Sequence, residues 1–229
     1  SLRSSTELRV YLAVMVAATV LIAGWVGTDH SATEAVRTSA IAVTSAMSTT
    51  GITTYPWWSF EAGAQALLLV LVGIGAMSGS AGGGFQYRRL LQAIQFSRRE
   101  LRRQLHPSEV AVVRVNDRAI DERALEYTTG FIVVFVLASV VGGMLIELGD
   151  SSISPSAAIS LSISALSTTG AQVLEPVDLA SLGPITKISL SGLMLVGRLF
   201  IYAVILTAFN MVVRLRQHTQ STLRDIRRD

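Results

Sequence analysis

The sequence predicts an all-α integral membrane protein made of two repeats, each containing a span, a short re-entrant helix, a Thr-Thr-Gly loop and a second span. Three observations lead to this prediction. The heptapeptide Ser45–Gly51 returns as Ser164–Gly170 with six of seven positions identical. Each copy lies between two hydrophobic stretches. The chain is 50% hydrophobic and 15% charged, whereas soluble domains carry about 25% charged residues.

Four stretches carry almost no charge and approach the ~20 residues that cross a bilayer. They are Leu8–Val26, Ala62–Met77, Tyr127–Ile146 and Ile188–Phe209. They predict spans at residues 8–26, 60–96, 127–148 and 184–213, the second of them broken. The alternative, buried helices of a large soluble protein, fits this charge distribution poorly.

A short helix is predicted between the spans of each repeat. Ser31-Ala32-Thr33-Glu34 is a capping-box pattern that begins a helix over 34–47. Ser154 followed by Pro155 predicts a capped helix over 155–166. Twelve residues reach only about 18 Å, so we expect these helices to re-enter the membrane. The loops 48–54 and 167–172 follow them, and the aromatic run Tyr55–Trp58 predicts an interfacial anchor.

The repeats define the domain organisation. Residues 1–97 and 127–213 form the two membrane units, residues 98–126 form a linker, and residues 214–229 form a basic tail. A short strand is predicted over Val110–Val115.

Basic residues gather on one side of the predicted spans. Six arginines lie between Arg88 and Arg103 and five from Arg214 onward, whereas the loops 27–59 and 147–187 contain only Arg37. The positive-inside rule then places both termini and the linker in the cytoplasm of a multi-pass protein of the cell membrane. Nucleic-acid binding is not expected, since the arginines flank spans and lack interleaved aromatic residues.

Several chemistries are excluded by composition. Cysteine is absent and the three histidines are scattered, so thiol chemistry, disulfides and cysteine or histidine metal sites are not expected. No catalytic triad or carboxylate pair is recognisable, and we predict a protein that is not an enzyme and has no covalent cofactor.

The Thr-Thr-Gly loops predict a cation pore. Irregular backbone at membrane depth is tolerated where it lines a wet cavity, and its carbonyls can replace the water around an ion. Glycine permits the backbone angles that align carbonyls, and the absence of nearby carboxylates favours a monovalent ion. The candidate ion-binding residues are Thr49, Thr50, Gly51, Ile52, Thr168, Thr169, Gly170 and Ala171. The alternative is a simple helix C-cap with a terminal glycine, which the duplication disfavours.

Two further features point to a gate. Four glycines in the six residues Gly79–Gly84 would unwind a helix, and breaks at membrane depth line permeation paths; close helix packing is the alternative. Arg198 lies within an apolar run, and an intramembrane charge marks a functional site; a charge satisfied by backbone alone is the alternative. The candidate gating residues are Gly79, Ser80, Gly82, Gly83, Gly84 and Arg198.

These motifs together resemble the Trk/Ktr/HKT superfamily of potassium transporters, in particular the third and fourth units of its TrkH/KtrB-like membrane subunits. The matching elements are Ser48–Gly51, Gly79–Gly84, Arg89, Leu105-His106-Pro107, Ser167–Gly170 and Leu195–Leu199. The resemblance implies a K⁺-channel-like fold in which four units surround one pore, with Gly51 and Gly170 as two of four filter glycines. It also implies a gating loop at Gly79–Gly84 with Arg198 beneath it.

The chain departs from the family pattern at three positions. Gln86 stands where lysine is usual, Phe200 where glutamate is common, and Ala171 where a larger residue is usual. Two of the four units are also absent. The start at Ser1 leads us to expect a C-terminal fragment, and two chains paired about a two-fold axis is the other arrangement. The resemblance further implies contact with membrane lipid and with a cytoplasmic nucleotide-binding regulatory subunit (TrkA/KtrA-like).

The function predicted on this basis is potassium uptake across the cytoplasmic membrane, through a carbonyl-lined filter gated by the glycine-rich loop. One alternative is sodium conduction, because the family's discriminating residue lies in the absent first unit. Another is a non-conducting half-channel that regulates or assembles with a full partner.

Overall fold

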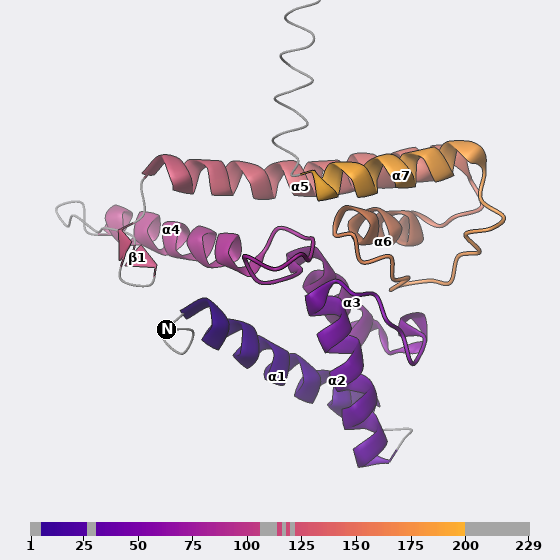
Figure 1. The fold of residues 1–229 in the computed structure, drawn as a ribbon, viewed down its shortest axis with the longest axis horizontal. Coiled ribbons are helices and arrows are strands. Elements are labelled where there is room, and N and C mark those ends of the chain that lie inside the picture. Colours follow the sequence, from indigo (N-terminus) through magenta and orange to yellow (C-terminus); the bar gives the residue numbers. More distant parts are fainter. Residues whose placement is uncertain (1–5, 27–30, 106–113, 116–117, 120–121, 200–229) are drawn as a thin grey trace, which may run out of the picture.

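The computed structural model describes residues 6–26, 31–105, 114–115, 118–119 and 122–199, and it is built of helices (Figure 1). The first unit contains α1 (Thr6–Val26), α2 (Ala32–Ser48), a 3₁₀ turn (Trp57–Ser59), α3 (Ala62–Ile74) and α4 (Tyr87–Leu105). The second unit contains α5 (Glu122–Gly149), α6 (Pro155–Leu166) and α7 (Pro184–Arg198). The all-helical architecture was predicted correctly.

The linker between the units contains one small hairpin. Strands β1 (Arg114–Val115) and β2 (Arg118–Ala119) pair antiparallel, with Val115 opposite Arg118. The strand predicted over Val110–Val115 is thus found over its last two residues, and the rest lies outside the described residues. Helix α4 continues to Leu105 and α5 begins at Glu122, so both extend into the segment predicted as linker.

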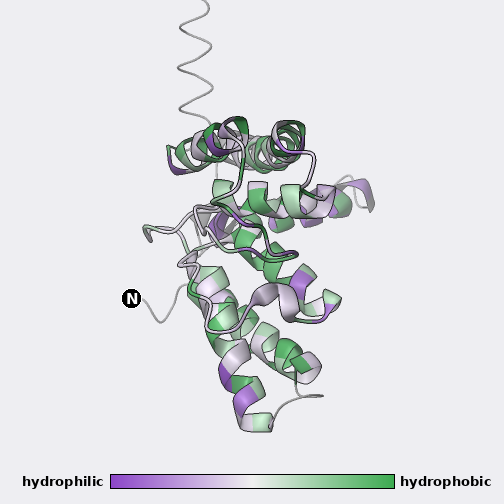
Figure 2. Cartoon of the chain, turned by 90° about the vertical axis from the view of Figure 1, so that its right-hand side faces the viewer, coloured by the Kyte–Doolittle hydropathy of each residue, from purple (hydrophilic) through white to green (hydrophobic). Residues whose placement is uncertain are grey.

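Two described helices are long and apolar enough to cross a membrane, judged by length and composition. They lie at Glu7–Val26 and Tyr127–Gly149, while α3 and α6 are shorter apolar helices. Figure 2 shows stretches of hydrophobic residues along the helices. Exposed apolar side chains such as Val16, Val20 and Leu148 form a surface suited to lipid or to other apolar helices. Of the span predicted over 184–213, the structure describes the part up to Leu199; the remainder and the tail 214–229 lie outside the described residues.

The core of the first unit forms where α1 and α3 pack on α2. Its fully buried residues include Ile22, Met47, Leu68 and Trp57. The burial of Trp57, which is 1% exposed, corrects the prediction that the whole aromatic run is an interfacial anchor. Its indole fills the core of the first unit, and Trp58 is the tryptophan of the run that reaches the surface.

Residues of the second unit complete this core. Ala171 and Val173 follow the second Thr-Thr-Gly loop, yet both are buried in the hydrophobic cluster of the first unit. Their exposed fractions are 3% and 0%. The first residues after the second loop therefore pack into the neighbouring unit.

Helix starts follow the sequence signals to different degrees. The Ser154 hydroxyl accepts the Ala157 N–H at 3.2 Å with proline at the next position, which confirms the predicted cap of α6. Helix α2 begins next to Ser31 as expected, but the Ser31 side chain accepts no cap hydrogen bond from the described N–H groups. The predicted capping box is wrong in this respect, because the Ser31 hydroxyl pairs with that of Thr33 instead.

In the second unit, glycines let the helices approach closely. A Cβ at Gly142 would crowd Ser162, and one at Gly197 would overlap the Leu166 carbonyl. Small residues are typical of packing between membrane helices. As a result α6 packs closely against both α5 and α7, below which it lies in Figure 1.

The two units pack directly on one another through α4 and α5. The Thr128 hydroxyl donates to the Gln92 side-chain carbonyl at 2.9 Å, and both residues are buried. The Arg89 guanidinium lies 3.8 Å from the centre of the Phe131 ring, a cation–π contact. Helix α3 also packs on α6, so the ends of the two short helices α2 and α6 are brought together.

Candidate functional site

The two Thr-Thr-Gly loops have the same backbone conformation. Thr49 and Thr168 have φ of 55° and 53°, and Gly51 and Gly170 have φ of 72° and 74°. The sequence duplication is thus matched by a duplication of two left-handed residues in each loop. Positive φ is ordinary for glycine, but it is a genuine outlier for a β-branched residue such as threonine.

Each loop begins as a Schellman helix cap. The Thr50 N–H donates to the Ser45 carbonyl at 3.0 Å and the Thr49 N–H to the Ala46 carbonyl at 3.2 Å. The second unit repeats the pattern from Thr169 to Ser164 and from Thr168 to Ala165, both at 2.9 Å.

The C-cap alternative from the sequence is therefore partly right, but the left-handed cap residue is threonine and the glycine lies two positions further on. A strained conformation of this kind costs roughly 1–3 kcal/mol and is typical of functional sites. A plain cap would place glycine there.

The loops meet at Gly51. A Cβ added to Gly51 would overlap the carbonyl group of Thr169, so the backbones of the two loops lie in contact there. By contrast, no described atom lies within 4 Å of the Cβ position of Gly170. The space at the first loop thus requires glycine, whereas the second loop requires it through backbone conformation alone.

The other predicted filter residues have different surroundings. Thr49 and Thr169 are buried, Thr50 and Ile52 are exposed, and Ala171 is buried in the first-unit core. An open groove of about 340 Å³ follows the exposed side of α2, and Thr50 and Ile52 line its end. The eight candidate residues are therefore brought together as two adjoining loops with one open side.

The glycine-rich break forms a compact loop, residues 75–86, which we call the gating segment after the role that the sequence predicts for it. It folds back on the end of α3, where the Gln86 N–H donates to the Ile74 carbonyl at 2.8 Å and the Ala76 N–H to the Gly83 carbonyl at 3.1 Å. Its glycines Gly79 and Gly84 have φ of 86° and 81°. The predicted interruption of the second span is thus a folded loop between α3 and α4.

The gating segment lies against both Thr-Thr-Gly loops. The Gly83 N–H donates to the Thr49 hydroxyl at 3.0 Å. A Cβ at Gly83 would also meet the Ser167 carbonyl and the Thr168 hydroxyl. One at Gly82 would lie 3.1 Å from the Ser48 carbonyl. The run of glycines is therefore required for this close approach.

Arg198 reaches the same segment from α7. Its guanidinium donates to the Ala81 carbonyl. This contact fits a gating role and also fits the alternative of a charge satisfied by backbone. It joins the second unit to the break in the first.

Two contacts of this site were missed by sequence reasoning. The Thr49 hydroxyl faces the gating segment, and the carboxylate of Glu7 on α1 binds Ser78 in that segment. A carboxylate in the first turn of an apolar span was the available signal for the second contact. No local pattern indicates that its partner lies 71 residues away.

The donor atoms at the site are backbone carbonyls and hydroxyls. Within the described ranges, no group of three or more acidic or histidine side chains is placed to hold a metal ion. The nearest carboxylate to the second loop by sequence, Glu175, accepts hydrogen bonds from Ser154 at 2.7 Å and from Ser156. The Ser156 bond, followed by the Ser154 bond, lowers the pKa of the Glu175 carboxyl below its ordinary value.

Comparison with known proteins agrees with this arrangement. The profile of the TrkH family, described as a cation transport protein, matches residues 9–214. The chain belongs to the TrkH family. Its membership confirms the resemblance drawn from the motifs, and the family is one of cation transport proteins rather than enzymes.

Two curated TrkH relatives are both named Trk system potassium uptake protein TrkH. The protein of Salmonella typhimurium is 31% identical and that of Escherichia coli K12 is 30% identical, each over 164 residues. The match covers 71% of this chain and 34% of each relative. The chain thus spans about a third of the length of these TrkH relatives.

The fold is also similar to a solved structure. The crystal structure of the potassium transporter TrkH from Vibrio parahaemolyticus superposes with a TM-score of 0.82 at 25% identity, covering 89% of this chain and 44% of that chain. The helical arrangement described above is therefore the TrkH fold over part of the length of that protein.

Proposed function

We propose that this chain supplies two of the filter-bearing units of a potassium-conducting pore in the cell membrane. The observation that carries the proposal is the pair of Thr-Thr-Gly loops, which share the same strained backbone and lie in contact at Gly51 and Thr169. Strain repeated at matched positions is difficult to explain as packing alone. The names of the TrkH relatives, potassium uptake proteins, support the choice of ion.

The chemistry of the loops favours a monovalent cation. Helices α2 and α6 both end at a loop, and the negative ends of their dipoles favour a cation there. Carbonyl and hydroxyl oxygens without carboxylates hold such an ion weakly enough for release. The proposed filter consists of the residues Thr49 to Ile52 and Thr168 to Ala171, with α2 and α6 re-entering the membrane as pore helices.

The gating segment is proposed to obstruct the path below this filter. Support comes from its contacts with the first residues of both loops, through Gly82 and Gly83. The Arg198 guanidinium binds the Ala81 carbonyl, in the exposed part of the gating segment. Such a contact is expected of an element that holds a gate. Opening would require the segment to leave both loops.

A complete pore needs more than these two loops. The groove along α2 leaves one side of the filter open, and the TrkH relatives are about three times as long as the matched region. We propose that further units, from a longer form of the same polypeptide or from a second copy, close the ring. The termini and the basic helix α4 face the cytoplasm in this proposal, and α4 contributes to docking of a nucleotide-binding regulatory subunit.

The test combines mass and transport. Native mass spectrometry of the detergent-purified protein gives its stoichiometry, and ⁸⁶Rb⁺ uptake into liposomes from the same sample gives conduction. We expect Gly170→Ser to reduce the preference for K⁺ over Na⁺ in competition, and the space at that Cβ position is open. Gly24→Ser is the matched control, because no described atom lies within 4 Å of that Cβ position.

The competing functions give different results in this assay. Equal inhibition of uptake by Na⁺ and K⁺ in the parent protein would favour sodium conduction. A stable assembly without uptake would favour the non-conducting half-channel. Unchanged selectivity in Gly170→Ser would overturn the filter assignment.

A further inference from the structure

The gating segment is held by a contact from α1 that its proposed role does not include. The Ser78 N–H donates to Oε1 of Glu7 at 2.7 Å, and the Ser78 hydroxyl donates to Oε2 at 2.7 Å. Both carboxylate oxygens are therefore used by a single residue of the segment. Hydrogen bonds to an ionised carboxylate are about twice as strong as neutral ones.

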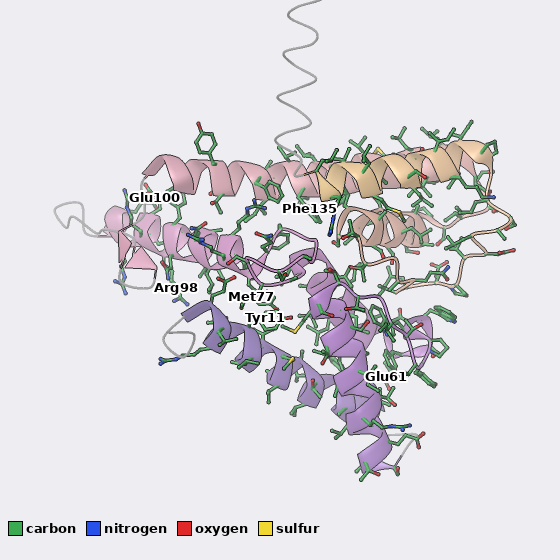
Figure 3. The ribbon with its side chains drawn as sticks, viewed as in Figure 1. Tyr11, Glu61, Met77, Arg98, Glu100 and Phe135 are labelled. Carbon is green, nitrogen blue, oxygen red and sulfur yellow. The ribbon has the colours of Figure 1, made fainter. Side chains whose placement is uncertain are left out.

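A second contact from the same face of α1 lies at the other end of the segment. Tyr11 packs edge-on against Tyr87, with ring centres 4.9 Å apart at 77°, and Tyr87 is fully buried. Residues four apart share one face of a helix, so Glu7 and Tyr11 form a single surface. Figure 3 shows the labelled Tyr11 on the side of α1 that faces the gating segment.

The two limbs of the segment are fixed in different ways. Residues 82–84 are wedged among backbone atoms of the filter loops and of α3. The limb around Gly79 is exposed, with no described atom within 4 Å of its Cβ position and a φ of 86°. Glycine backbone there is free to move, and local packing does little to restrain it. Bonds from Ser80 to the Met77 carbonyl shape this limb from within, and the bonds from Ser78 to Glu7 tie it to α1.

We propose that Glu7 is a positioning residue that latches the gating segment against the filter and so sets how often the pore opens. The proposal rests on the gating role proposed above. Arg198 and Glu7 bind the same exposed limb from opposite units, at Ala81 and at Ser78. Lifting the limb must break both contacts. The free energy of the hydrogen bonds between Ser78 and Glu7 therefore stabilises the closed state.

The test uses the absence of cysteine from the chain. A spin label on Ala81→Cys, an exposed position, reports the mobility of the limb in the full assembly, and ⁸⁶Rb⁺ flux is measured on the same preparations. We expect Glu7→Gln to mobilise the label and to raise flux about five-fold, the effect of weakening one charge-assisted pair. Ser78→Ala, which removes the hydroxyl and keeps the backbone N–H, should give a smaller change in the same direction.

Glu61→Gln is the matched control. Glu61 is exposed at the start of α3, where its side chain makes no cap hydrogen bond, and both measurements should stay at the parent values.

Each outcome bears on one of the two proposals. Unchanged mobility in Glu7→Gln overturns the latch, and so does increased mobility with unchanged flux. Increased mobility in samples that conduct nothing, parent included, would support the contact and overturn the proposed pore. If Glu7→Gln fails to assemble, the same readouts from Ser78→Ala decide.

Discussion

The two units share a heptapeptide that is identical at six of seven positions, and their loops have the same conformation. The residues that support the two loops differ in chemistry. After the first loop, the Tyr55 and Phe60 rings stack at 5.4 Å, and the Gln65 amide donates to the Trp58 and Phe60 carbonyls at 2.8 and 2.9 Å. After the second loop, Ala171 and Val173 pack into the core of the first unit, and the rest of the support is polar. Gln172 exchanges two hydrogen bonds with Val177, and Glu175 binds the start of α6.

The second span differs as well. In the first unit it breaks into α3 and α4 around the gating segment, whereas in the second unit α7 runs unbroken to Arg198. One unit therefore supplies the segment that is proposed to move, and the other supplies a side chain that binds it. The comparison teaches that the strained loop is the common part, and that its surroundings were free to diverge because they need only keep that loop in place.

The largest expected difference between the units is at the two loop glycines. Gly51→Ala forces a side chain into the Thr169 carbonyl as well as into a left-handed backbone, and we expect a loss of about 4 kcal/mol of stability or failure to assemble. Gly170→Ala meets the backbone penalty alone, about 1–2 kcal/mol. Thermal unfolding in detergent measures both, with Gly24→Ala as control. Equal losses at the two positions would show that the loops do not touch at Gly51.

A smaller difference is expected between the two left-handed threonines. Thr49→Val keeps the β-branched shape but leaves the Gly83 N–H without its acceptor, which costs about 1–3 kcal/mol. Thr168 accepts no such bond from the described residues, so Thr168→Val should cost less than about 1 kcal/mol. Chemical or thermal unfolding of the matched pair checks this. A greater loss from Thr168→Val would mean that the gating segment is held mainly by the second unit.

The smallest expected difference appears at acid pH. The lowered pKa of Glu175 means that its stabilising bonds are fully present above the ordinary value of 4.5 and are lost as pH falls through the lowered pKa. Below pH 4.5 the melting temperature should fall less in Glu175→Gln than in the parent. The pKa of Asp150 is lowered by Ser152, so part of the acid sensitivity should remain. Glu34→Gln, in the first turn of α2, is the control, and parent-like acid sensitivity in Glu175→Gln would count against this anchor.

Local signals in the sequence predicted the parts of the fold that depend on local physics. The cap at Ser154, the short apolar helix after it and the interruption by glycines each follow from neighbouring residues. The heptapeptide repeat pointed to both loops because its two copies face the same conformational demand. It did not reveal which residue would be left-handed, since glycine is the residue that ordinarily accepts that conformation and here threonine does.

The missed features depend on contacts distant in sequence. The residue type of Trp57 predicts an interfacial position. Its burial depends on how α1, α2 and α3 pack around it. Ser31 had the correct pattern for a cap, but its hydroxyl found a nearer partner in Thr33. The pairing of Glu7 with Ser78 requires the whole first unit to be folded.

The burial of Ala171 and Val173 in the core of the first unit has a consequence for biogenesis. A ribosome delivers the first unit to the membrane well before residue 173 is made, and domains that fold as they emerge normally close their cores at once. We expect this core to stay incompletely filled until the residues after the second Thr-Thr-Gly loop arrive. Nascent chains arrested between the two units should therefore stay loosely packed and sensitive to protease. Maturation of the first half is thus timed by translation of the second.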